Sequence, residues 1–167
     1  GHVLFTDFES WRSTIRSETM TRRRPLKRLL NVFEDVVIEQ YLSKEFGVER
    51  ILSIKNEHKH KELGVFQTSA RADPTDLAQY FAQPHDPVQI AMMVAEERGR
   101  YSIGIIDAHQ DDSTQLNLKT TGMWSADEII KKTEKVLFEA ITEPNAYDRY
   151  QVVADLFDDL FEKTANE

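Results

Sequence analysis

The chain has 167 residues, a net charge of −8 and no cysteine, and each of these facts excludes some classes of protein. Its length suits one domain, or one domain with an added helical arm, and its 40% hydrophobic content supplies a normal core. The lack of cysteine excludes disulfides, thiol catalysis and cysteine-based zinc sites, and it favours an intracellular protein, cytoplasmic or nuclear. Because no run of about 18 apolar residues occurs, we expect no membrane span.

The first 47 residues predict two helices. Thr6 and Glu9 have the spacing of a capping box, which predicts a helix over residues 7–20. The stretch 21–24 then interrupts, and Pro25 is expected to be the first residue of a longer helix that Gly47 ends. We expect residues 1–47 to form a helical arm or hairpin.

The middle of the chain predicts strands. They are expected at residues 48–54, 63–70, 101–107 and 115–120, and the last two are expected to form an antiparallel hairpin. Asp73-Pro74 predicts a short helix, and Asp86-Pro87 predicts a second helix over residues 88–98. Gly99 is expected to end it. Residues 88–98 also alternate acceptably as a strand, so the periodicity leaves both readings open.

Two amphipathic helices are expected at the C-terminal end. Ser125 and Glu128 form a capping box that opens a helix over residues 126–141, and a last helix follows Glu143-Pro144-Asn145. The predicted fold class is therefore α+β, with an N-terminal helical arm, a small mostly antiparallel sheet and two C-terminal helices. The predicted division is an arm at 1–47 and an α+β domain at 48–167, or one compact domain overall.

A run of basic side chains is the first candidate site. The net charge argues against broad nonspecific binding to nucleic acid, but it leaves a local basic patch open. Such a patch would contact phosphates and release counterions, whereas a solvated helix junction, or a partner for the acidic C-terminal helix, explains the run equally simply. Its members are Arg12, Arg16, Arg22, Arg23, Arg24, Lys27 and Arg28, opposed only by Glu18.

Acidic and histidine side chains give a second candidate site. Asp107, His109, Asp111 and Asp112 fall in the expected hairpin turn, where they would bind a divalent metal and activate water for phosphodiester chemistry. The same residues are also ordinary turn composition. A further cluster between residues 57 and 62 (Glu57, His58, His60 and Glu62) reads mainly as a solvated connection, and His85 reads as a loop residue.

One segment resembles a known family. Residues 111–141 combine a short strand, a Gly turn and a helix that begins with acidic residues. The matching positions are Leu116, Leu118, Thr120, Gly122, Asp127, Glu128, Ile129, Ile130, Lys131, Lys132 and Leu137. This combination resembles the dimerisation domain of α-type RNA polymerase subunits. Residues 73–81 are a distorted match to that family's other dimerisation helix, but the HTLGN-like motif typical of that helix is absent.

The resemblance implies that one helix face meets a partner subunit in a platform for polymerase assembly. The residues of that expected interface are Ile129, Ile130, Thr133, Val136, Leu137 and Ile141. The alternative is that this face packs on the protein's own core.

No nucleotide-binding or hydrolase motif of the common kinds occurs, so we expect no cofactor and no catalysis. The favoured function is a non-catalytic assembly module whose partner is another protein or a second copy, as in a transcription complex. The alternative is a nucleic-acid-binding protein that uses the basic run, with or without metal chemistry at residues 107–112.

Overall fold

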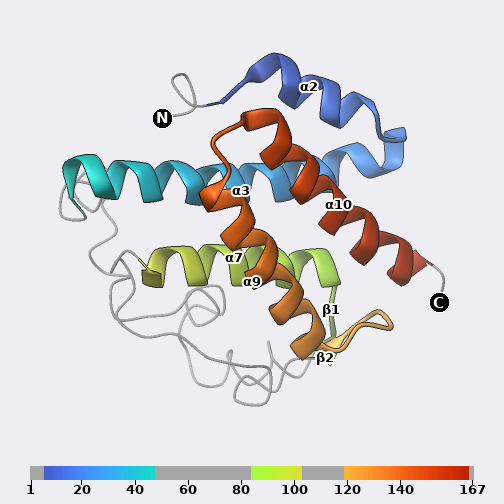
Figure 1. Ribbon diagram of the computed structural model, residues 1–167. Helices are drawn as coiled ribbons and strands as arrows, with labels where there is room; N and C mark the ends of the chain where they lie inside the picture. Colours follow the sequence, from blue (N-terminus) through green and yellow to red (C-terminus); the bar gives the residue numbers. More distant parts are fainter. Residues whose placement is uncertain (1–5, 48–83, 103–118, 166–167) are drawn as a thin grey trace.

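The computed structural model describes residues 6–47, 84–102 and 119–165. Five helices and two short strands occupy them: α2 (Phe8–Arg16), α3 (Met20–Phe46), β1 (Pro84–His85), α7 (Pro87–Ser102), β2 (Lys119–Thr120), α9 (Ala126–Thr142) and α10 (Ala146–Ala165). In the view of Figure 1, α2 and α7 lie on opposite sides of the long helix α3, and α9 and α10 cross the bundle.

One hydrophobic core joins all five helices. The largest contribution from α3 is its apolar stripe of Leu26, Leu29, Leu30 and Phe33, which are at most 2% exposed. The spacing of these residues is the i, i+3, i+4, i+7 pattern of a buried helix face. Trp11 of α2 belongs to the same core, so α2 and α3 pack together with the C-terminal helices.

The predicted α+β fold class is wrong for the part of the chain that the structure describes. There, 82% of residues are helical and 4% are in strands, and the two strands pair in parallel. Pro84 lies opposite Lys119, and His85 lies opposite Thr120. Residues 101–102 were expected in a strand but form the end of α7. The described strand at 119–120 therefore pairs in parallel with residues 84–85, which were not expected in a strand. Residues 103–118 of the expected hairpin lie outside the described residues, as do the predicted strands at 48–54 and 63–70 and the predicted helix at 73–81.

The N-terminal helices begin at residues other than those expected. Asp7, not Thr6, caps α2, because its carboxylate accepts hydrogen bonds from the Ser10 amide at 3.2 Å and the Ser10 hydroxyl at 2.6 Å. These bonds lower the pKa of Asp7. Pro25 lies inside α3 instead of opening it, because α3 begins at Met20. The stretch 21–24 is thus helical, and its arginines are presented from a helix.

Helix α7 starts as predicted and continues past its expected end. The Asp86 carboxylate accepts hydrogen bonds from the amides of Val88 (2.8 Å) and Gln89 (3.3 Å), as expected of a helix start. Gly99 does not end the helix. It lies where α7 meets α3, and a Cβ at this position would overlap the Val36 side chain. Glycine is therefore needed here for close helix packing.

The two C-terminal helices form where the sequence predicts them. The capping box of α9 is complete: Ser125 accepts from the Glu128 amide at 3.2 Å, and Glu128 accepts from the Ser125 amide at 2.9 Å. The expected apolar face of α10 is buried, with Tyr150, Val153, Phe157 and Leu160 at most 2% exposed. Within the described ranges, none of the helices has the length and apolar character needed to cross a membrane.

Candidate nucleic-acid interface

The structure divides the seven basic residues of the N-terminal run into two groups. Arg22 and Arg23 are half-buried and bond to other parts of the protein. The other five are exposed. Among the described residues no carboxylate pairs with any of the five. They are Arg12 and Arg16 of α2 and Arg24, Lys27 and Arg28 of α3, which we call the cationic surface.

Arg22 joins the start of α3 to the C-terminal part of α10. Its guanidinium lies 2.7 Å from a carboxylate oxygen of Asp158 and stacks over the rings of Phe157 and Phe161, at 5.2 and 4.9 Å from their centroids. Burial, followed by a hydrogen bond with Glu18 and the charge of Glu18, raises the pKa of Asp158 to about 6, although Arg22 acts in the opposite direction. Arg22 is therefore engaged in holding the fold.

Arg23 fixes the turn between α2 and α3. Its Nε donates to the carbonyl oxygen of Glu18 at 2.9 Å, and its Nη2 donates to that of Arg16 at 3.0 Å. These carbonyls belong to the last residue of α2 and to the link that follows it, where backbone acceptors lack helical partners. The bonds restrain α2 relative to α3, and with it the arginines that α2 carries.

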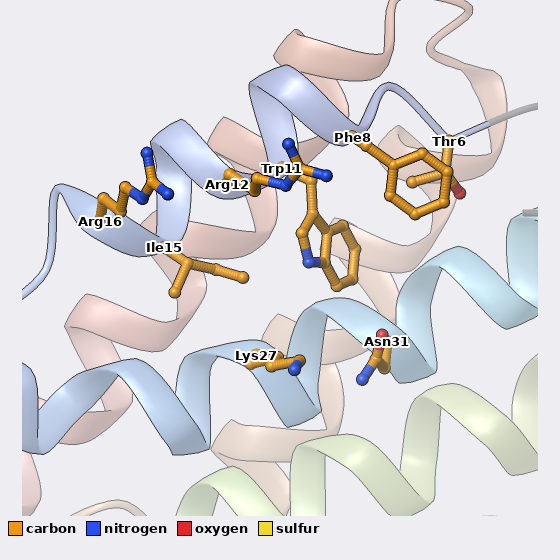
Figure 2. A pocket seen from close by; sticks show the side chains of 8 residues that line it. All are labelled: Thr6, Phe8, Trp11, Arg12, Ile15, Arg16, Lys27 and Asn31. Atoms are coloured by element: carbon orange, nitrogen blue, oxygen red, sulfur yellow. The ribbon is translucent and has the colours of Figure 1, made fainter.

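A hollow lies between α2 and α3 next to the cationic surface. Its volume is about 470 Å³. Figure 2 shows apolar side chains of α2 on the side that faces α3, with Lys27 and Asn31 opposite them on α3. The lining residues of this α2–α3 hollow are Thr6, Phe8, Trp11, Arg12, Ile15, Arg16, Lys27 and Asn31.

Three members of the cationic surface line this hollow. Arg12 and Arg16 come from successive turns of α2, about 6 Å apart along its axis. Lys27 lines the hollow from α3. A second hollow, of about 500 Å³, is lined by the same two arginines together with Glu9, Ser13 and Ser17. The two arginines thus contribute to both hollows, and Glu9 is the acidic side chain among the lining residues.

A buried polar network supports one end of the α2–α3 hollow. Glu34 of α3 is 2% exposed and accepts from Arg149 of α10 through both oxygens, at 2.9 and 3.3 Å. Its second oxygen also accepts from the Thr6 hydroxyl at 3.2 Å. The Asp7 amide donates to the Tyr150 hydroxyl at 3.1 Å. The residues at the start of α2 are therefore tied to both α3 and α10.

Tyr150 stays protonated in this setting. Burial, together with the nearby charge of Glu34, raises the pKa of its hydroxyl to about 12. Its ring meets the Trp11 ring edge to face, with centroids 5.4 Å apart. Trp11, which is 8% exposed, is thereby fixed as the floor of the hollow.

Sequence reasoning found the cations of the hollow but missed its other walls. Phe8, Trp11 and Ile15 recur at helical spacing, but that spacing does not show that Phe8 is 45% exposed and Ile15 is half-buried. The signal was present in the order of residues, since Arg12 and Arg16 immediately follow apolar positions at helical spacing. Nothing in the sequence indicated a role for Asn31, because only the packing of α3 against α2 places it at the hollow.

The predicted subunit-interface residues lie in the core. Ile129 and Thr133 are fully buried, Ile130 and Leu137 are each 5% exposed, and Val136 and Ile141 pack partly buried against the same core. This face of α9 packs on the protein's own helices, which the sequence left open as the alternative. Contact with a partner subunit through it stays a prediction, and such contact would require α9 to separate from α7 and α10.

The predicted metal residues Asp107, His109, Asp111 and Asp112 lie outside the described residues, as do the histidines at 58 and 60. In the part of the chain that the structure describes, no group of three or more metal-ligating side chains comes together. His85, expected in a loop, is instead a strand residue that is 7% exposed.

Comparison with known proteins gives no match: no family model, no curated protein and no solved structure is significantly similar to this chain.

Proposed function

We propose that the protein is a non-catalytic module that binds nucleic acid through the cationic surface of α2 and α3. One observation carries the proposal: Arg12, Arg16 and Lys27 line a single hollow, and among the described residues none of them is paired with a carboxylate. Cations that the fold itself does not neutralise are available for phosphates, which supply most of the affinity in such complexes.

The rest of the cationic surface extends this site along α3. Arg24, Lys27 and Arg28 are spaced by three and four residues, so they share one side of the helix with Asn31 of the hollow. A nucleic-acid backbone that crosses the hollow would therefore meet further cations beside it. The excess negative charge elsewhere on the protein restricts binding to this face.

The sequence's other proposal, assembly through α9, has less support. Its central residues are already buried against α7 and α10, whereas the cationic surface is open. The α-like dimerisation role and catalysis at residues 107–112 stay predictions.

Salt-dependent binding to a labelled oligonucleotide tests the proposal. If each of the five cations meets one phosphate of a single strand, the logarithm of the affinity falls with the logarithm of salt concentration with a slope of about −3.5. The triple variant Arg12→Gln, Arg16→Gln, Lys27→Gln should bind weakly and reduce that slope by about 2.

The matched control changes the same amount of charge elsewhere. Lys44→Gln, Lys131→Gln and Lys135→Gln remove three exposed cations at the end of α3 and along α9. Both triple variants lower the net charge by three, so only a local site distinguishes them. Equal loss of binding in the two variants would contradict a site on α2 and α3, and so would a wild-type protein that binds no oligonucleotide at low salt.

A further inference from the structure

The α2–α3 hollow offers an open aromatic ring next to its cations. Phe8 is 45% exposed, and among the described residues its ring stacks on no other aromatic ring. Trp11, by contrast, is occupied by its contact with Tyr150. Figure 2 shows the Phe8 ring at one end of the hollow, with Trp11 and Ile15 following it along α2.

From this arrangement we infer that the hollow receives an unpaired base of a single-stranded nucleic acid, stacked on Phe8, while Arg12, Arg16 and Lys27 contact the flanking phosphates. The inference rests on the proposed function and adds to it a preference for single strands over duplexes. Proteins that bind single strands combine aromatic stacking platforms with a positively charged path for the backbone, and both parts occur here.

The hollow is large enough to admit a base. A volume of about 470 Å³ falls within the range of pockets that hold small molecules, and the hollow opens along the groove between two helices. A duplex would present only the edges of its paired bases in the grooves. The face of a base becomes available for stacking only when that base is unpaired.

Asn31 supplies a polar group for the edge of such a base. Its carboxamide has donors and an acceptor, and among the described residues it forms no hydrogen bond through its side chain. Thr6 offers less, because its hydroxyl already donates to Glu34 at 3.2 Å. The polar contacts would therefore come from one amide and three cations, which suits stacking with weak sequence preference.

The platform is held before any ligand arrives. Asp7, immediately before Phe8, caps α2 and is bonded to Tyr150 through its amide. Arg23 restrains the other end of α2. A ring carried on a restrained helix loses little backbone freedom on stacking, which favours affinity.

The test compares Phe8→Leu with wild type on two probes: a labelled oligothymidylate of about 12 nucleotides and a duplex of matched charge. Leucine keeps an apolar side chain at this exposed position but removes the aromatic face. We expect Phe8→Leu to bind the single strand about tenfold more weakly and the duplex unchanged. Phe138→Leu, a change at a ring that is 70% exposed on α9, should alter neither.

An abasic oligonucleotide completes the design. It should bind as weakly to wild type as oligothymidylate binds to Phe8→Leu, and the variant should not weaken it further. Equal affinity of wild type for single strand and duplex would overturn the inference and leave the proposed function standing. Absence of binding to both probes would overturn both proposals. So would tighter binding of an oligoglutamate peptide than of either nucleic acid, because the occupant would then be an acidic protein segment.

Discussion

Replacing Arg149 with methionine should destabilise the fold more than any surface change. Arg149 is 6% exposed and lies against Glu34, which is 2% exposed, so neither charge can be hydrated by bulk water. Methionine fills much of the same space without the charge. The variant leaves the Glu34 carboxylate buried with the Thr6 hydroxyl and the Tyr150 hydroxyl as its remaining polar neighbours.

The magnitude follows from that geometry. Removing one partner of a buried ion pair costs about 3–5 kcal/mol of unfolding free energy, because an uncompensated charge remains. The upper part of this range is expected, since Arg149 also donates to the carbonyl oxygens of Glu143 and Pro144, each at 3.3 Å. These carbonyls lie in the link between α9 and α10, so the variant loosens that connection as well.

Urea denaturation followed by circular dichroism measures this loss. The double variant Glu34→Leu, Arg149→Met removes both charges and should be more stable than Arg149→Met alone. Lys132→Met is the surface control: Lys132 pairs with Asp159 at 3.1 Å, both side chains are partly exposed, and the expected loss is at most about 1 kcal/mol. If Arg149→Met lies within 1 kcal/mol of wild type, or the double variant is the least stable of all, the reasoning about an uncompensated charge is refuted.

Three further predictions concern helix packing, pH and capping. Gly99→Ala should lose about 1–2 kcal/mol in a urea titration despite its better helix propensity, because the added Cβ overlaps Val36, and Val36→Ala in the same chain should restore part of the loss. Folding raises the pKa of Asp158 from 3.8 to about 6, so this carboxyl stabilises the fold most below pH 3.8, and the contribution is lost as the pH rises through 6. Asp158→Asn should therefore flatten the dependence of the melting temperature on pH across that window, and an unchanged slope would contradict this. Ser125→Ala should cost about 1 kcal/mol by thermal melting, against less than 0.5 for Lys131→Ala on the same helix.

Local signals predicted the two C-terminal helices well. Ser125, Glu128 and the apolar spacing of α10 act within a few residues of one another, so the sequence contains all that these helices need to start and to orient. The predicted start of α3 at Pro25 was wrong, because this proline is tolerated inside the helix. Pro25 removes one backbone donor in the second turn, yet Thr21, four residues earlier, is exposed, so its carbonyl can bond water.

Distant contacts were beyond the reach of sequence reasoning. Arg22 and Arg23 look like Arg24 in the sequence, but the first two bond to α10 and to the end of α2, and only the third stays open. Asp158, which pairs with Arg22, and Arg149, which pairs with Glu34, each lie more than a hundred residues away from their partner along the chain. A single sequence therefore predicts the positive charge of the candidate site, whereas the fold decides which charges remain available.

The exposed charges and the buried charges of this protein should respond differently to ionic strength. Dissolved ions screen the exposed arginines and Lys27, so a ligand held there should be released as salt rises. The same ions have little access to the pair of Glu34 and Arg149, which keeps its attraction. A rise in salt concentration should therefore release a ligand bound at the hollow without melting the helices that form it.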